Sequence, residues 1–149
     1  TRSALDTAQG PFTERYEGYA AAMRDAGLEP RLVATVNAAT REEEGRRAGQ
    51  RLVERADGID AVFAACDAMA LGAMEAIASA DLAIPQDIGV MGFDDLIAGR
   101  FSRPPLTTIG PDPAEAGAAL VQAVLGSDEQ VSHHRVPVRL IARGSTARE

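Results

Sequence analysis

The sequence predicts an α/β fold in which a sheet of parallel strands lies between layers of helices, an α/β/α sandwich. Short apolar runs alternate with segments of helical length, and turn-forming residues separate the two kinds of segment. Parallel neighbours need crossover connections of about a dozen residues or more, and these helices supply them. The 149 residues, 46% of them hydrophobic, are enough for one core. We therefore expect one layered unit, complete or part of a larger protein.

The first half of the chain predicts a helix, a strand and a second helix. Apolar residues recur at helical spacing over 14–26, and Gly27 follows as a left-handed terminator. The β-branched run 32–36 predicts a strand. Thr40 and Glu43 then have the spacing of a capping box, worth about 1 kcal/mol at a helix start. Before it stops at Asp57-Gly58, this second helix should bury Ala48, Leu52, Val53 and Ala56.

Two apolar runs in the middle of the chain predict neighbouring strands. The run 61–65 precedes Asp67, which we expect to be the N-cap of a helix over 68–80. The run 88–91 leads into the acidic turn Gly92-Phe93-Asp94-Asp95 and then into an irregular segment. Because both strands run the same way, the residues after them should share the carboxyl edge of the sheet, where open α/β sheets bind ligands.

The last third predicts an extended entry, a helix and a final strand. Pro104-Pro105 excludes a helix and favours an extended segment over 106–109. Asp112 and Pro113 pair an N-cap residue with proline at the first helical position. The run 135–141 predicts a strand whose proline suggests an edge or a bulge. Up to Gly126, one face of the helix is apolar, with Ala116, Ala119, Leu120, Ala123 and Val124.

Charge and composition exclude several classes of function. A net charge of -7 argues against a nucleic-acid surface on this chain. Every basic residue is an arginine, which excludes Schiff-base and P-loop lysine chemistry. Cys66 is the single cysteine, so no internal disulfide is possible. No apolar run is long enough to cross a bilayer and the first ten residues do not form a signal peptide, so we expect a soluble, cytoplasmic chain without membrane contact.

Three side chains are candidates for a ligand site. Cys66 and Asp94 each follow a predicted strand and should meet at one edge of the sheet. Arg15, near the start of the first helix, could reach an anionic or hydroxyl-rich ligand with its planar fork of donors. Alternatively, Cys66 is a small buried residue, Asp94 or Asp95 caps the following turn, and Arg15 is a solvated helix arginine. The residues alone leave both interpretations open.

The residues give no signature of an enzyme or a metal site. Neither histidine has a context that would make it the base for a Cys66 nucleophile. His133 and His134 are neighbours whose side chains point apart, and Asp94-Asp95 lacks the further ligands of a cation site. We therefore expect no catalysis, no metal and no cofactor.

Several motifs in unbroken order resemble the LacI/GalR family of bacterial transcriptional repressors, and together they cover nearly the whole chain. They resemble the family's Arg-x-x-Gly-Tyr helix start, its Pro-x-Leu-Thr-Thr signature and its closing Leu-x-x-Arg-x-Ser-Thr. The stretches that carry the resemblance are Arg15–Tyr19, Asp60–Ala64, Asp67–Gly72, Ile84–Asp95, Pro104–Ile109 and Leu140–Thr146.

The resemblance implies a type I lobe of the periplasmic-binding-protein-like fold, within a partial effector-binding domain over 1–149. Residues 13–110 and 135–146 would form the C-terminal lobe, and the helix 112–126 would pack on an N-terminal lobe outside this chain. Operator DNA would be bound only by a separate N-terminal head. The alternative is a lobe of a periplasmic sugar- or solute-binding protein, which shares the fold.

The resemblance also implies site residues. Arg15, Cys66 and Asp94 match family positions that contact the effector, and Phe93 would line the same cleft. Cys66 stands where asparagine or aspartate is usual, and a thiol is a weak hydrogen-bonding group. The implied effector is a sugar, polyol or purine-like molecule, less polar or differently oriented than a typical sugar.

The family resemblance implies a homodimer as well. Its C-terminal lobes pair about a two-fold axis, and Leu71, Met74 and Phe101 are the apolar residues expected at that surface. The apolar face of the helix 113–125 would lack its partner lobe. We therefore expect this helix to fold back on the C-terminal lobe or to meet another copy.

Overall fold

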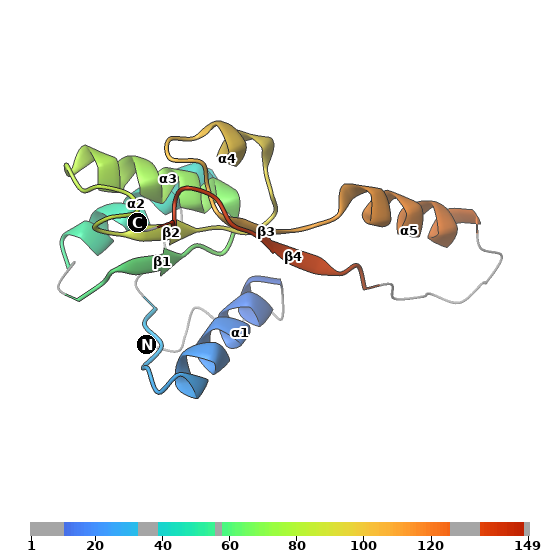
Figure 1. The fold of residues 1–149 in the computed structure, drawn as a ribbon, viewed down its shortest axis with the longest axis horizontal. Coiled ribbons are helices and arrows are strands. Elements are labelled where there is room, and N and C mark those ends of the chain that lie inside the picture. The colour runs from blue at the N-terminus through green and yellow to red at the C-terminus, as the bar shows by residue number, and fades with distance from the viewer. Residues whose placement is uncertain (1–10, 33–38, 56–57, 126–134, 148–149) are drawn as a thin grey trace.

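The computed structural model describes residues 11–32, 39–55, 58–125 and 135–147 of the chain (Figure 1). Helices and strands alternate along much of it, as the sequence predicts. Most of the predicted strand at 32–36 and the predicted linker at 127–134 lie outside the described residues. In chain order the elements are α1 (Pro11–Asp25), α2 (Arg41–Val53), β1 (Ala61–Phe63), α3 (Asp67–Ser79), β2 (Gly89–Met91), α4 (Ile97–Phe101), β3 (Thr108–Pro111), α5 (Pro113–Leu125) and β4 (Val138–Ile141).

A short parallel sheet forms the centre of the molecule. β1 and β2 pair in parallel with Val62 opposite Val90, and Met91 makes a further parallel bridge to Thr107. Helices α2 and α3 lie on one side of these strands and α1 on the other (Figure 1), where Tyr19 packs against Phe63 with ring centres 6.4 Å apart. The α/β class with a parallel sheet between helical layers is therefore confirmed.

The last strand pairs in the opposite direction, which the alternation of strands and helices does not predict. β4 is antiparallel to β3, with Thr108 opposite Ile141 and Pro111 opposite Val138. This ribbon leads away from the sheet toward α5 (Figure 1). Pro137 directly precedes β4, so the strand begins where the proline no longer interrupts its ladder.

Helices α2 and α3 pack closely because glycines on each helix lie against the backbone of the other. A Cβ atom on Gly45 would lie 2.0 Å from the Met69 carbonyl oxygen, and one on Gly72 would lie 2.0 Å from the Glu42 carbonyl oxygen. Leu52 is buried as predicted, Ala48 and Val53 are half-buried, and Ala56 lies outside the described residues. The sequence pattern identified the aliphatic part of this interface and missed its glycines.

The core lies between this helix pair and the strands. Every side chain in it comes from a predicted element or its immediate flank. Its buried members are Leu52, Ala70, Met74, Ile77, Ile88, Val90 and Leu106.

Of two caps predicted at the beginnings of helices, the structure confirms one and corrects the other. The Thr40 hydroxyl accepts a hydrogen bond from the Glu43 N–H at 3.2 Å, as the capping box predicts. The prediction that Asp67 is an N-cap is wrong: Cys66 occupies that position, without a side-chain cap bond, and Asp67 is the first residue of α3. The Asp67 carboxylate is taken up by longer-range contacts described below. The segment predicted to be irregular contains α4.

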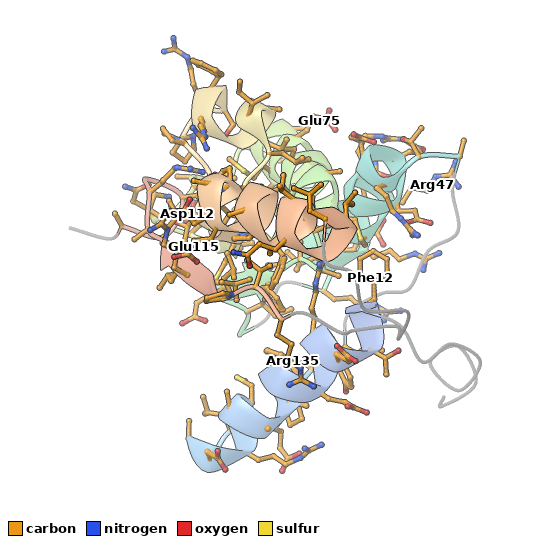
Figure 2. The ribbon with its side chains drawn as sticks, turned by 90° about the vertical axis from the view of Figure 1, so that its right-hand side faces the viewer. Phe12, Arg47, Glu75, Asp112, Glu115 and Arg135 are labelled. Carbon is orange, nitrogen blue, oxygen red and sulfur yellow. The ribbon has the colours of Figure 1, made fainter. Side chains whose placement is uncertain are left out.

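Helix α5 projects away from the sheet (Figure 1), and none of its thirteen residues is buried. Leu120 is 68% exposed and Val124 is 81% exposed. The expectation that this helix folds back on the C-terminal lobe is therefore wrong for the single chain. The N-terminal end of α5 is held by Asp112 (Figure 2), which accepts hydrogen bonds from the Ala114 N–H and from Arg139 on β4.

No helix in the described parts of the chain combines the length and the apolar character that a membrane span needs.

Candidate functional site

The acidic turn lies at the carboxyl end of β2. The Asp94 N–H donates to the Ile109 carbonyl oxygen at 2.7 Å, so the turn is joined to β3. Asp94 has a φ of 115° and Asp95 a φ of 54°, both in the region that favours glycine. Two consecutive non-glycine residues in this region are a source of backbone strain that surrounding contacts must sustain.

Arg15 joins α1 to this turn. Its guanidinium donates to the Ala65 carbonyl oxygen at 2.6 Å and to Asp94 Oδ1 at 3.1 Å. The same group lies over the Phe93 ring, with Cζ 3.7 Å from the ring centre. Three segments distant in sequence therefore meet at the Arg15 fork, at the edge where β1 and β2 end. The structure brings Arg15, Phe93 and Asp94 together, as the family resemblance implies.

The aromatic and cationic contacts continue beyond Arg15 along α1. Phe12, in the first turn of that helix (Figure 2), lies between Arg15 and Arg41, whose Cζ atoms are 5.6 Å and 4.9 Å from the Phe12 ring centre. Phe12 is 37% exposed. Its contacts hold the start of α1 against the start of α2, and so support the position of Arg15.

The surroundings of Asp94 disfavour the charged form of its carboxyl group. Burial raises the pKa of the Asp94 carboxyl, the Arg15 guanidinium opposes this increase, and the negative charge of Asp67 adds to it. The net result is a pKa above the ordinary value. The side chain of Asp94 is still 39% exposed, so a ligand can reach it. A carboxylate that lacks full compensation from the protein is suited to accept hydrogen bonds from ligand hydroxyl or N–H groups.

Cys66 occupies the N-cap position of α3 beside this group. Its neighbours on both sides take part in the site, because the Ala65 carbonyl accepts from Arg15 and the Asp67 N–H donates to the Phe93 carbonyl at 2.7 Å. The Cys66 residue itself is 5% exposed. It therefore shares the edge with Arg15 and Asp94 but offers a ligand little surface.

Asp95 has different partners from Asp94 and a structural role. It accepts from Arg143 Nη2 at 2.5 Å and from Arg100 Nη2 at 2.6 Å. Burial raises the pKa of Asp95, but hydrogen bonds from these two arginines outweigh burial and hold the pKa below its usual range. Asp95 therefore ties the turn to α4 and to the segment that follows β4, and Asp94 is the more exposed of the two carboxylates.

Sequence reasoning missed the part that Asp67 plays. Asp67 is 0% exposed, and its two carboxylate oxygens accept hydrogen bonds from the Thr108 hydroxyl and from the Leu96 N–H. An aspartate before a helix carries the same local signal whether it caps that helix or binds elsewhere. The contacts that distinguish the two lie 29 and 41 residues away in sequence.

The three residues expected at a dimer surface lie in different environments. Met74 is 5% exposed and belongs to the core, so it cannot offer surface to a partner, and Leu71 is half-buried against that core. Phe101 is 79% exposed, next to Ile97 at 72% on the same short helix. The expectation therefore needs correcting for Met74, whose helix face turns inward.

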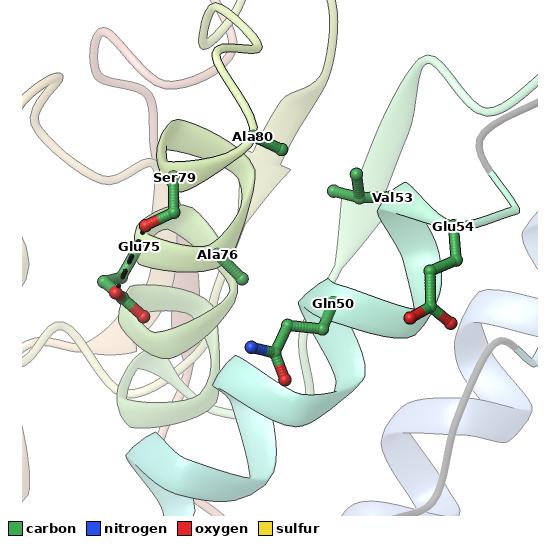
Figure 3. Close-up of a pocket in the computed structure, with 7 residues that line it drawn as sticks. All are labelled: Gln50, Val53, Glu54, Glu75, Ala76, Ser79 and Ala80. Atoms are coloured by element: carbon green, nitrogen blue, oxygen red, sulfur yellow. Dashed lines mark hydrogen bonds between the residues drawn. The ribbon is translucent and has the colours of Figure 1, made fainter.

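A shallow hollow of about 390 Å³ lies apart from this group, between the C-terminal ends of α2 and α3 (Figure 3). Glu75 and Ser79 on its α3 side are hydrogen-bonded at 3.3 Å, and Glu54 lines its α2 side. Among the residues that the structure describes, no group of three or more His, Cys, Asp and Glu side chains could hold a metal ion.

The fold is an α/β lobe with polar residues gathered at the carboxyl edge of its parallel strands. The model of the periplasmic binding protein-like domain matches residues 4–146. The chain belongs to that family, and its resemblance to the LacI/GalR regulators is confirmed.

Individual relatives agree with this assignment. The chain is 34% identical over 129 residues to the HTH-type transcriptional repressor PurR of Haemophilus influenzae (strain PittEE), covering 87% of this chain and 38% of that protein. A LacI-family regulator from Sanguibacter keddieii has a TM-score of 0.75 and 34% identity, over 89% of this chain and 51% of the other. The regulator CelR in its complex with cellobiose has a TM-score of 0.74 and 29% identity, over 89% and 42%.

These relatives favour the effector-binding domain of a regulator over a lobe of a periplasmic solute-binding protein. The chain spans less than two fifths of the length of the PurR relative and about half of the Sanguibacter structure.

Proposed function

We propose that this chain forms one wall of the cleft in which a LacI-type transcriptional regulator binds a small-molecule effector. The observation that carries the proposal is the meeting of Arg15, Phe93 and Asp94 at the carboxyl edge of β1 and β2. This is the place where an open α/β sheet binds ligands. The proposed role is binding and not catalysis, which is supported by relatives that are named as transcriptional repressors and regulators.

The chemistry of the group suggests what it binds. The Asp94 carboxylate accepts hydrogen bonds, the Arg15 fork donates them, and the Phe93 ring gives an apolar face. A ring that carries hydroxyl or N–H groups at its edge satisfies all three. The proposed effector is a sugar, polyol or purine-like molecule, and one structural relative is a complex with cellobiose, which supports the sugar. The buried Cys66 thiol contributes a weak hydrogen-bonding group at most, so the effector is held mainly by Arg15 and Asp94.

We also propose that α5 packs on the second lobe of the cleft, in the part of the protein outside this chain. The proposal is supported by the exposure of an apolar face on a helix that leaves the sheet on a two-stranded ribbon. In the intact protein the DNA-binding head would bind the operator in the cytoplasm, and effector binding between the lobes would change that affinity.

The pairing surface is proposed to lie on α4. Ile97 and Phe101 expose most of their surface beside Leu96, which is 42% exposed. A two-fold pair through this short helix would bury them and form a homodimer. Light scattering of the intact protein tests this, because Phe101→Glu should shift the dimer toward monomer while the exposed Leu28→Glu should not. A dimer that persists in Phe101→Glu contradicts the assignment.

The effector proposal is tested by thermal-shift measurements on the intact protein with sugars, polyols and purines. A compound that binds only the folded state at about a hundred times its Kd stabilises it by about 2.7 kcal/mol and raises Tm. We expect at least one such compound, and we expect Arg15→Ala to abolish its shift while Arg24→Ala on the exposed end of the same helix retains it. A shift that persists in Arg15→Ala excludes this site.

A further inference from the structure

Asp67 lies immediately behind the proposed site. Its carboxylate is fully buried, with Oδ2 accepting from the Leu96 N–H at 2.7 Å and Oδ1 accepting from the Thr108 hydroxyl at 2.5 Å. Its own N–H donates to the Phe93 carbonyl oxygen at 2.7 Å. Asp67 therefore makes hydrogen bonds to the segment before Asp94, to the segment after it and to the strand beside it.

These partners surround the strained turn. Leu96 directly follows Asp94-Asp95, and Thr108 precedes Ile109, whose carbonyl accepts from the Asp94 N–H. A Cβ atom on Gly92 would lie 2.2 Å from Asp67 Oδ1, so the backbone at the start of the turn runs directly against the carboxylate. Positive φ values at Asp94 and Asp95 persist only if surrounding contacts sustain them, and Asp67 provides several of those contacts.

We propose that Asp67 is a positioning residue for effector binding: it holds the turn in the conformation that presents the Phe93 ring and the Asp94 carboxylate to Arg15. Its role in binding depends on the proposed function, whereas its hold on the turn can be measured without any ligand. Asp67 touches no ligand itself, because its carboxylate is enclosed by the residues that it positions.

The charge of Asp67 gives this role a separate signature. Asp94 faces Arg15 from α1 and Asp67 from the start of α3, while the adjacent Asp95 is engaged by Arg100 and Arg143. The negative charge of Asp67 raises the pKa of the Asp94 carboxyl, in addition to the effect of burial. Loss of the Asp67 charge should therefore appear in the titration of Asp94, whereas loosening of the turn should appear in the exchange of its amides.

The test uses Asp67→Asn in the intact protein, followed by carboxyl NMR titration and amide hydrogen exchange. Asparagine can still accept from the Leu96 N–H, but it can meet the Thr108 hydroxyl only by donating to it, so both contacts lose their charged acceptor and become weaker. We expect exchange at the Leu96 and Asp94 amides to become about ten to a hundred times faster, because two hydrogen bonds to a buried charge are replaced by weaker neutral ones. We expect the titration midpoint of Asp94 to fall. The Val90 amide, bonded to Ser145 in the core, should keep its protection.

Thr108→Val and Thr108→Ser keep the proposal testable if Asp67→Asn does not fold. Valine removes the hydroxyl and leaves the Asp67 charge, so exchange at the turn should accelerate while the Asp94 midpoint stays closer to that of the parent chain than in Asp67→Asn. Serine keeps the hydroxyl and should restore protection. Unchanged exchange at Leu96 and Asp94 in both Asp67→Asn and Thr108→Val, or an equal loss at Val90, would overturn the proposal.

These outcomes separate the positioning role from the proposed function. If the turn loosens as expected but no compound from the effector screen binds the intact protein, the positioning role stands and the proposed function fails. If a compound binds through Arg15 and Asp94 while the exchange at the turn is insensitive to Asp67, the proposed function stands and the positioning role fails.

Discussion

The guanidinium of Arg15 lies over the Phe93 ring, with its Cζ 3.7 Å from the ring centre, so the main hydrogen-bond donor of the site packs against an aromatic side chain. The N–H groups at the edge of the guanidinium donate to the Ala65 carbonyl and to Asp94 while its carbon lies over the ring. The orientation of the fork is therefore set before a ligand arrives, which lowers the entropic cost of binding.

Replacing the ring should weaken effector binding without unfolding the protein. Phe93→Leu keeps apolar bulk and removes the cation–π contact, worth about 0.5–2 kcal/mol. We expect about a three- to thirtyfold increase in the Kd of a compound found by the thermal-shift screen, measured by calorimetry on the intact protein. Phe93→Tyr retains the ring and serves as the matched control. Equal affinities for the leucine and tyrosine variants would show that the stacking is irrelevant.

Asp94→Asn should stabilise the chain at neutral pH. A carboxyl whose pKa is higher in the folded protein holds its proton more tightly there, so its stabilising contribution is present at low pH. That contribution is lost as the pH rises from the ordinary value of 3.8 through the raised folded value. Asparagine stays neutral and avoids the loss.

The measurement is the melting temperature of both proteins at a series of pH values. The asparagine variant should melt higher at neutral pH, and the difference should shrink as the pH falls toward 3.8. A variant that melts lower than its parent at neutral pH would mean that the Arg15 contact, and not burial, dominates the environment of Asp94.

Asp95→Asn should have the opposite effect, although the two aspartates are adjacent. Because Arg143 and Arg100 hold its pKa low, Asp95 stabilises the fold above 3.8, and this stability is lost as the pH falls through the lowered folded value. Its side chain is 10% exposed, so we expect asparagine to cost about 1–3 kcal/mol at neutral pH. Urea unfolding measures this.

The matched control for Asp95→Asn is Asp112→Asn. Asp112 pairs with Arg139, whose side chain is 63% exposed, and asparagine is also a good N-cap residue. The control should therefore change the free energy of unfolding less than Asp95→Asn does. A larger effect in the control would contradict the structural role assigned to Asp95.

The glycine contact between α2 and α3 predicts a large difference between two Gly→Ala changes. Gly72→Ala would place a Cβ 2.0 Å from the Glu42 carbonyl, so the helices must separate, at a cost of about 1–3 kcal/mol or more. Gly18→Ala on α1 meets nothing within 4 Å and should stabilise the helix by about 0.5–1 kcal/mol. Thermal unfolding measures the Tm of both variants, and we expect Gly72→Ala to melt well below Gly18→Ala. Similar Tm values would contradict the close packing of α2 and α3.

Features encoded by neighbouring residues could be predicted from the sequence. Gly27 has a φ of 72° after α1, the Thr40 cap forms, and the strands at 61 and 89 pair in parallel. The contact between Arg15 and Asp94 can be predicted only by combining the positions of the strand ends with the family resemblance, because 79 residues separate the two in sequence.

Features that depend on distant partners could not be predicted. Asp67 carries the local signal of an N-cap, yet its acceptor oxygens are claimed by Leu96 and Thr108. Gly72 is an unremarkable helix residue until its neighbour across the interface is known. Met74 fits an apolar surface as well as a core by its sequence alone, and only the packing of α3 decides between them.

The most direct test of the central claim, that this lobe binds an effector through the Arg15–Asp94 group, is a calorimetric titration of the intact protein with a compound found by the thermal-shift screen. Arg15→Ala and Asp94→Ala should each raise the Kd about ten- to a hundredfold, since each leaves a ligand group without its partner. Arg24→Ala should leave the Kd unchanged. Wild-type affinity in both Arg15→Ala and Asp94→Ala would contradict the account.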